Sequence, residues 1–289
     1  MRITVPLIFF IAMSFHSAEK YQFCDVLSGR SSFCLWPPLF PGFPLRNTSI
    51  QELRELVMEK DNIKEVEVGE GLKLTIQELE HVCDSTTGRT LTGSWVWDSA
   101  LVLSEWMASE LGRSELNLHS KTVIELGAGM GIPGLTAARL GATRVILTDI
   151  APLLPGLRRN IELNGLEDRV EVRELVWGLD ESTVSQRDES REVLNLVLMS
   201  DVFFNPSEMT ALAKTLKAVS GPETRLWGAT EMRPWTGECL AELVSQGFGV
   251  VELASRLGPM SELRTVEGNE EELPLFLVFR LVPTCSNSV

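Results

Sequence analysis

The chain has 289 residues, of which 44% are hydrophobic and 23% are charged, and its formal net charge at pH 7 is -14. This length allows one large domain with an N-terminal extension. The acidity argues against nucleic acid and anionic membranes as partners; the alternative is that the negative charge only increases solubility. The five cysteines and three histidines are scattered and form no metal-binding motif, so we expect neither a metal site nor a disulfide framework.

Residues 1–47 are expected to form an N-terminal extension. An apolar run from Ile3 to Phe15 has the length of a signal-peptide core but is too short to span a bilayer. Residues 1–18 are therefore a candidate targeting segment; the alternatives are an apolar extension or a start codon placed too far upstream. We expect a cytoplasmic protein, or an organellar or secretory one if residues 1–18 are a genuine targeting segment.

Residues 48–120 are expected to form an elaboration that precedes the main domain. Residues 50–60 show helical spacing of apolar side chains behind a capping Thr or Ser. Residues 64–76 alternate apolar and polar side chains around two glycines, which is typical of a β-hairpin. A further helix is expected from about Asp98, a candidate N-cap, to Leu111.

Strands and helices alternate over residues 121–283. Strands are expected at residues 122–126, 144–149, 170–177, 194–201, 224–230, 249–256 and 273–282, and helices after residue 132, from about 152 to 164, from 206 to about 219, and from 237 to 246. Continuous apolar runs in several strands are typical of parallel strands buried on both faces. Alternation that ends in two strands with no long helix between them predicts an α/β fold with a doubly wound sheet and an antiparallel edge.

A glycine-rich loop follows the first strand of this domain. Residues 121–142, KTVIELGAGMGIPGLTAARLGA, contain both G-x-G-x-x-G, the pattern of a dinucleotide loop, and E-x-G-x-G-x-G, a pattern for a cofactor without phosphates. Gly127, Gly129 and Gly131 are expected to let the backbone turn sharply and approach a ligand closely. Asp149 ends the next strand, where a carboxylate binds ribose hydroxyls. These features fit either NAD or S-adenosylmethionine.

Three features favour S-adenosylmethionine over a dinucleotide. Glu125 is expected at the mouth of the pocket, where a carboxylate would repel a pyrophosphate but attract an ammonium and a sulfonium. Trp177, at the expected end of the third strand, offers a flat face for an adenine ring. The chain also shows no Tyr-x-x-x-Lys or His/Asp pair of a hydride-transfer enzyme, and Tyr21 is its only tyrosine.

Four segments carry a resemblance to a known family. They are TGSWVWDSALVLSEWM at residues 92–107, VIELGAGMGIPGLTAARLGA at 123–142, VILTDI at 145–150 and SDVFFNP at 200–206. Together they resemble the seven-β-strand protein methyltransferases of the lysine methyltransferase-like group. The resemblance implies a seven-stranded, Rossmann-like sheet with an antiparallel last strand.

The resemblance also implies a site. The residues that would line the cofactor pocket are Trp97, Gly127, Ala128, Gly129, Asp149, Trp177 and Ser200. Glu125 would support the glycine loop, and Asp201 would lie beside the methyl group and the incoming amine. Residue 204 is Phe, whereas many lysine-specific members carry Tyr there. Residues 200–209 and 226–235 also resemble a branch of the family that acts on arginine.

The resemblance implies an S-adenosylmethionine-dependent enzyme that transfers a methyl group to a protein side-chain nitrogen, with lysine favoured. An arginine-directed enzyme, a small-molecule N-methyltransferase and a catalytically inactive interaction protein are the alternatives. The acceptor is expected to be a protein with a basic segment, because the chain is acidic, and the chain is expected to be monomeric.

Methyl transfer requires a neutral nitrogen, and an aromatic slot lowers the pKa of lysine by desolvation. Our hypothesis is that Asp201 hydrogen-bonds this nitrogen, while Phe203, Phe204 and Trp95 or Trp97 wall the slot. One of the two phenylalanines is expected in the core, because adjacent side chains at a strand end point in opposite directions.

Other residues near these segments have more ordinary interpretations. Trp106, Trp227 and Trp235 are expected to be packing residues. Glu231 and Arg233 are either a surface pair or part of the substrate mouth.

Overall fold

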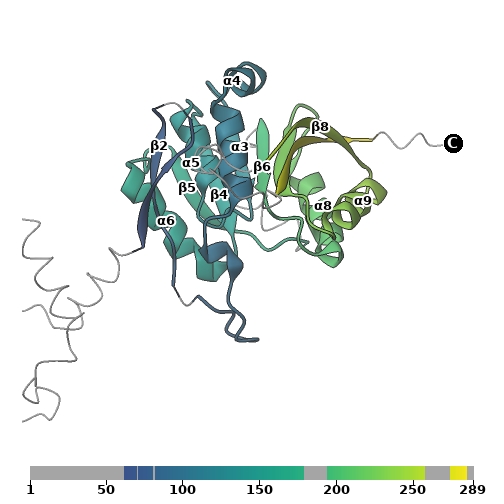
Figure 1. Cartoon of the computed structure of the whole chain (residues 1–289), viewed down its shortest axis with the longest axis horizontal. Coiled ribbons are helices and arrows are strands. Elements are labelled where there is room, and N and C mark those ends of the chain that lie inside the picture. Colours follow the sequence, from purple (N-terminus) through teal and green to yellow (C-terminus); the bar gives the residue numbers. More distant parts are fainter. Residues whose placement is uncertain (1–61, 70, 81, 179–193, 258–273, 285–289) are drawn as a thin grey trace, which may run out of the picture. The chain divides into compact units, whose positions relative to one another are not determined.

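The computed structural model describes residues 62–69, 71–80, 82–178, 194–257 and 274–284 (Figure 1). The predicted extension, its candidate targeting segment and the helix expected at residues 50–60 lie outside the described residues. The described residues all belong to one compact unit, Ile50–Val289. Within the part of the chain that the structure describes, no helix is long and apolar enough to cross a membrane.

A seven-stranded sheet forms the centre of the fold and runs in the order β5-β4-β3-β6-β7-β9-β8. Its strands are β3 (Thr122–Leu126), β4 (Arg144–Asp149), β5 (Val170–Glu174), β6 (Leu196–Ser200), β7 (Arg225–Glu231), β8 (Phe248–Leu257) and β9 (Leu275–Pro283). The first five are parallel, and β9 lies antiparallel between β7 and β8. The predicted doubly wound sheet with antiparallel strands at one edge is confirmed.

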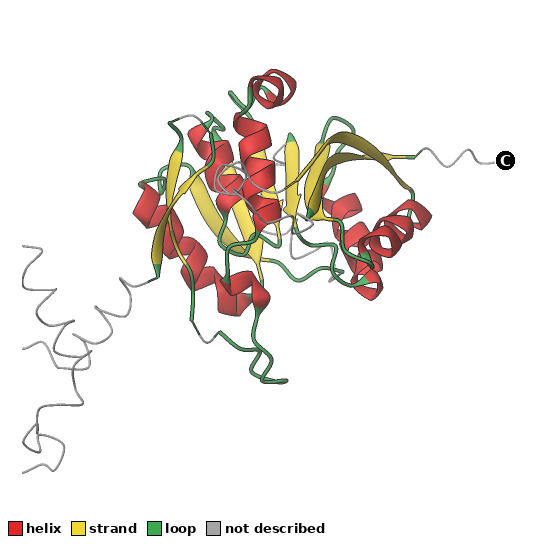
Figure 2. Ribbon diagram, viewed as in Figure 1, coloured by secondary structure: helices red, strands yellow, loops and turns green. Residues whose placement is uncertain are grey.

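Helices cover both faces of the sheet (Figure 2). They are α3 (Asp98–Ala108), α4 (Glu110–Leu116), α5 (Ile132–Arg139), α6 (Leu154–Asn164), α8 (Met209–Val219) and α9 (Thr236–Ser245), with short 3-10 turns η1 (Thr92–Ser94), η2 (Ala151–Leu153) and η3 (Pro206–Glu208). Side chains of α3, α5 and α6 share one hydrophobic core, whereas those of α8 and α9 share the other. The central strands are buried on both sides for this reason, which explains their continuous apolar runs.

Strands β1 (Ile63–Glu67) and β2 (Lys73–Gln77) form a hairpin, as the alternation of residues 64–76 predicts, and this hairpin packs on α6. Two asparagines one helical turn apart fix this contact. Asn160 accepts a hydrogen bond from the backbone of Gln77 at 2.8 Å, and Asn164 accepts one from that of Thr75 at 3.0 Å. The Asn160 amide also donates to the carbonyl of Met130 at 3.1 Å, so the hairpin is tied to the glycine loop. The strand's free backbone groups are thereby satisfied by side chains.

Two predicted elements end elsewhere. The helix expected from 98 to 111 is broken at Ser109, whose backbone is extended and whose hydroxyl accepts from the amide of Gly112 to start α4. The third strand was expected to reach Trp177, but it ends at Glu174, and the chain turns at Gly178, which has φ 77°. Trp177 therefore lies in a loop rather than at a strand end.

Candidate active site

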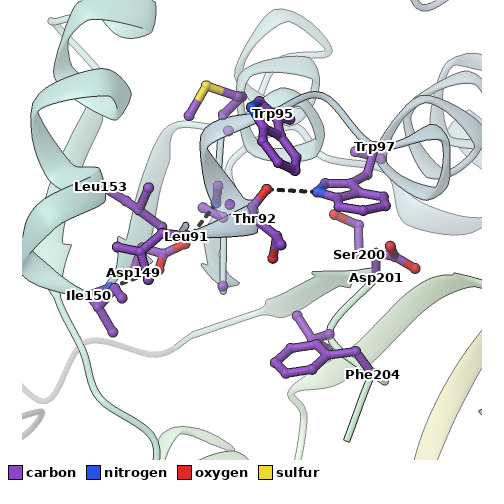
Figure 3. Close-up of a pocket in the computed structure, with 18 of the residues that line it drawn as sticks. Leu91, Thr92, Trp95, Trp97, Asp149, Ile150, Leu153, Ser200, Asp201 and Phe204 are labelled. Carbon is purple, nitrogen blue, oxygen red and sulfur yellow. Dashed lines mark hydrogen bonds between the residues drawn. The ribbon is translucent and has the colours of Figure 1, made fainter. Parts of the chain in front are cut away.

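A pocket of about 670 Å³ lies at the carboxyl ends of the parallel strands β3, β4 and β6. This is where an open α/β sheet binds ligands, and the volume is typical of a cofactor site. The predicted site residues that line it are Trp97, Gly127, Ala128, Gly129, Asp149, Trp177, Ser200, Asp201 and Phe204. Of these, Figure 3 labels Trp97, Asp149, Ser200, Asp201 and Phe204. Glu125 is the predicted site residue that does not line it.

The glycine loop has a backbone that other residues adopt only at a cost. Gly127, Gly129 and Gly131 have φ values of 62°, 53° and 81°. A Cβ on Gly127 would lie 2.9 Å from Val202 Cγ1, and one on Gly129 would lie 3.0 Å from the carbonyl oxygen of Gly93. The sequence suggests that these glycines admit a ligand; the structure shows that they are needed first for this conformation and for packing against the protein itself.

Asp149 joins the glycine loop to the end of β4. Its Oδ2 accepts from the amide of Gly129 at 2.8 Å, and its Oδ1 accepts from its neighbour Ile150 at 2.8 Å (Figure 3). The pKa of Asp149 is raised, because the effect of burial exceeds the lowering effect of these two N–H groups. Each oxygen can accept one further hydrogen bond, so the carboxylate suits the two hydroxyls of a ribose.

Glu125 lies behind the glycine loop and not at the pocket mouth, so that prediction is wrong. The side chain is fully buried, because β3 is covered on both faces. Its Oε2 accepts from the amide of Gly134 at 2.8 Å, while its Oε1 has no partner. Burial, opposed by the Gly134 amide and aided by the nearby Asp149 carboxylate, raises the pKa of Glu125 to about 8. The protonated side chain supports the loop and has no charge to repel a pyrophosphate.

Three large aromatic side chains on the pocket lining are exposed to solvent. Trp95 is 44% exposed, Phe204 is 54% exposed and Trp235 is 41% exposed. Trp235 was expected to be a packing residue, and that prediction is wrong: it follows β7 at the open edge of the pocket. Phe203, in contrast, is fully buried and does not line the pocket. The expectation that one member of the Phe pair lies in the core is confirmed, and the hypothesis that Phe203 walls the slot is wrong.

The other two expected packing tryptophans lie in the core. Trp106 and Trp227 are buried, with ring centroids 4.6 Å apart. Trp97 instead lines the pocket, and its indole N–H donates to the carbonyl of Thr92 at 2.9 Å (Figure 3). This bond ties the turn of η1 to the start of α3, and both residues line the pocket.

Asp201 sits in a network that joins three elements. It follows β6 with φ 53°, a left-handed conformation that Asp tolerates better than most residues. Arg233, beyond β7, binds both carboxylate oxygens, with Nη1 2.9 Å from Oδ1 and Nη2 3.0 Å from Oδ2. The Ser99 hydroxyl of α3 donates to Oδ1 at 3.0 Å. Both oxygens of Asp201 are therefore already in use.

Arg233 itself is held from three sides. Besides Asp201, it contacts Glu231, with 2.6 Å between Nη2 and Oε2. Its guanidinium also lies 5.4 Å from the centre of the Trp97 ring, within range of a cation–π contact. The surface-pair interpretation of Arg233 is wrong, because its side chain is only 18% exposed and lines the pocket.

Residues 73–245, more than half of the chain, match the profile of a family described as lysine methyltransferase. The chain belongs to the lysine methyltransferase family. It is an S-adenosylmethionine-dependent N-methyltransferase, and the predicted family, enzyme class and cofactor are confirmed.

Named relatives of this methyltransferase differ in their acceptors. The protein N-lysine methyltransferase METTL21A of Danio rerio is 34% identical over 161 residues, covering 55% of this chain and 69% of that protein. The protein N-terminal and lysine N-methyltransferase EFM7 of Gibberella zeae is 28% identical over 183 residues, covering 56% and 68%. The histone-arginine methyltransferase METTL23 of Xenopus laevis is 32% identical over 155 residues, covering 51% and 62%.

A solved structure supports the fold of the methyltransferase. SMU.776, a putative methyltransferase complexed with SAH, aligns with a TM-score of 0.52 at 14% identity, over 78% of this chain and 57% of that chain. At this identity the likeness concerns the fold alone.

The pocket of this methyltransferase fits the methyl donor. Asp149 offers two acceptors for a ribose, and Trp177 packs beside Gly127, where its ring can cover an adenine. When bound, S-adenosylmethionine supplies a methyl group activated by a sulfonium. Ser200 and Asp201 line the pocket where β6 ends.

Some site residues carry little signal in the sequence. Ser99 is an ordinary small residue in α3, and it meets Asp201 only because the fold joins positions 102 residues apart. Thr92 and Gly93 adjoin Trp97 in a segment that carries the family resemblance, so their place in the pocket could have been predicted. Arg233 did carry a signal in the sequence: it is a cation two residues after β7, a strand that ends at the edge of the pocket.

Proposed function

We propose that this methyltransferase methylates a lysine side chain of a protein substrate at the aromatic edge of the donor pocket. The observation that carries the proposal is the exposed aromatic rim, formed by Trp95, Phe204 and Trp235. An exposed rim can admit a side chain that projects from a folded or extended protein. The relatives named as protein-lysine methyltransferases support the choice of acceptor.

The residues of the chain act mainly by positioning. Because the methyl carbon is activated by its donor, alignment of the acceptor nitrogen supplies most of the rate enhancement. Asp149 and the glycine loop hold the donor, while Trp95 and Phe204 exclude water from the lysine stem and favour its neutral form. The new C–N bond forms as the C–S bond breaks, and the methylated amine releases its proton to solvent.

The acceptor is proposed to carry its lysine in a basic segment. The net charge of -14 supports this, and Glu208, an exposed side chain on the pocket lining, supplies negative charge near the rim. A cytoplasmic location is proposed, since Cys83 and Cys239 are free thiols, which suits a reducing compartment. The chain is also proposed to be monomeric.

Arginine is the second candidate acceptor. Phe204 cannot accept a hydrogen bond from an ammonium, as the Tyr of many lysine-specific members could. The relatives named histone-arginine methyltransferase METTL23, from Xenopus laevis and Mus musculus, are each 32% identical. These observations favour arginine only if the Phe ring serves to stack on a planar guanidinium.

A labelling experiment distinguishes these functions. The purified protein is incubated with tritiated S-adenosylmethionine and an extract of cells that lack the chain, and the labelled residue is identified by mass spectrometry. Methyl-lysine in a protein is the expected result. Methyl-arginine would establish the second candidate, and label confined to small molecules would refute both. Donor binding by calorimetry without any transfer would indicate an inactive interaction protein.

A further inference from the structure

Arg233 is the only cation among the described residues that line the pocket, whose other charged side chains are Asp149, Asp201 and Glu208. It lines the same pocket as the exposed aromatic rim and forms a two-point contact with Asp201, the residue implied to lie beside the acceptor nitrogen. Such a fork fixes the plane of the carboxylate as well as balancing its charge. The charge state of the slot therefore depends on this one side chain.

The contacts of Arg233 hold it in that place. Glu231 binds the guanidinium from the end of β7, and Trp97 lies against it from the start of α3. Ser99 hydrogen-bonds both carboxylate residues that hold Arg233, namely Asp201 and Glu231. The Ser99 hydroxyl donates to Asp201 at 3.0 Å and accepts from the amide of Glu231 at 3.1 Å. A guanidinium fixed from three elements does not have to be ordered when substrate enters.

We infer that Arg233 is a positioning residue that acts through Asp201 and keeps the acceptor slot free of uncompensated negative charge. This rests on the proposed function. An unpaired carboxylate beside a lysine stabilises its ammonium form and raises its pKa by roughly 1 to 3 units, which leaves the nitrogen without its lone pair. Paired with Arg233, Asp201 can orient the nitrogen without holding it in the protonated form.

The charged groups at this slot, or in contact with Arg233, come from four elements. Asp149 ends β4, Asp201 follows β6, Glu208 lies on η3, Glu231 ends β7, and Arg233 lies beyond β7. Removal of Arg233 therefore increases the negative charge of the slot with no other described cation in the pocket lining to compensate. Removal of the Asp201 charge has the opposite effect.

The first test needs no acceptor, because S-adenosylmethionine carries a sulfonium and S-adenosylhomocysteine carries a neutral sulfur at the same place. Calorimetry gives Kd for each ligand with the full-length protein. The quantity compared is the Kd for S-adenosylmethionine divided by the Kd for S-adenosylhomocysteine. In Arg233→Gln this ratio is expected to fall at least about threefold, because the free Asp201 carboxylate attracts the sulfonium. Arg233→Lys and the double variant Asp201→Asn with Arg233→Gln are expected to keep the wild-type ratio.

Two controls make the ligand test decisive. Arg169→Gln removes an exposed arginine that pairs with Asp168 away from the pocket, and it is expected to leave the ratio unchanged. If Arg233→Gln does not fold, Asp201→Asn carries the test with the opposite sign. It removes a negative charge from the slot and leaves Arg233 paired with Glu231, so the ratio is expected to rise. An unchanged ratio in a folded variant of either kind would overturn the inference.

The second test measures the rate at limiting acceptor against pH, with the same extract and labelled donor. In Arg233→Gln the rising limb of the profile is expected to move up by about one pH unit, a tenfold loss at a pH on that limb, and to return towards wild type in the double variant. A uniform loss of rate with no shift would show that Arg233 is only structural. Label on arginine in the wild type would overturn both this inference and the lysine proposal, whereas label on lysine with no shift would overturn this inference alone.

Discussion

The buried carboxyl of Glu125 makes a specific prediction about stability and pH. Its pKa rises from an ordinary value of 4.5 to about 8 in the folded protein. Between these two values the folded state binds a proton that the unfolded state has released, so the free energy of unfolding falls as pH rises. The substitution Glu125→Gln keeps the shape and the acceptor for the Gly134 amide but removes the titration.

The size of the effect follows from the same interval. Each pH unit between the two pKa values contributes about 1.4 kcal/mol, so from pH 5.5 to pH 8.5 the wild type is expected to lose about 3 kcal/mol relative to Glu125→Gln. At pH 5.5 the two proteins are expected to differ by less than about 1 kcal/mol, because a protonated carboxyl and an amide both place a donor where Oε1 lacks a partner.

Urea unfolding at a series of pH values measures this difference. The midpoint and slope give the free energy of unfolding for each protein, and subtraction cancels every titration that the two share. Glu115→Gln, at an exposed glutamate of α4, controls for the loss of one carboxylate. The free energy of unfolding is plotted against pH for wild type and Glu125→Gln. If the two plots ran parallel from pH 5.5 to 8.5, the folded protein would not hold an extra proton on Glu125, and the reasoning would be refuted.

Three further predictions concern the site. Asp201→Ala and Phe204→Ala are each expected to lower turnover, and the loss is expected to be about 100-fold or more for Asp201→Ala, because it removes a positioning group. Donor affinity, measured by calorimetry, is expected to stay within about threefold of wild type. Unchanged turnover in both variants would disprove these roles. Asp149→Ala is expected to weaken donor binding by about 10-fold or more, since two amides lose their acceptor as well as the ribose, and an unaltered Kd would contradict this. Gly129→Ala is expected to destabilise the protein by about 1–2 kcal/mol in thermal unfolding, because its φ is 53° and its Cβ would lie 3.0 Å from a backbone oxygen, so an unchanged Tm would count against that account.

Much of the fold could be predicted because its strands have a simple physical signature. Strands β3 and β6 are covered on both faces, so most of their residues are apolar, and the apolar residues mark the strand directly. The ends of elements were harder to predict. Ser109 interrupts a helical pattern through its backbone conformation, and Trp177 continues an apolar run beyond the last strand residue.

The position of Glu125 shows why a motif did not determine the location of a side chain. The pattern E-x-G-x-G-x-G fixes the order of residues, but the alternation of β3 between two buried faces decides where the carboxylate points. An acidic residue in an otherwise apolar strand end could mean a charge at the pocket or a buried acid that holds the loop. Only the contact with the Gly134 amide separates these, and it depends on the packing of α5.

The acidic slot shows the same limit at the level of a network. Asp201 could be predicted as a site residue, but its partners are 102 and 32 residues away in the chain, on α3 and beyond β7. Our hypothesis from the sequence was that Asp201, beside an aromatic wall, hydrogen-bonds the neutral acceptor nitrogen, and it included no partner for the carboxylate. With Arg233 bound to both oxygens and Ser99 bound to Oδ1, the carboxylate is suited to a neutral amine, the form that methyl transfer needs.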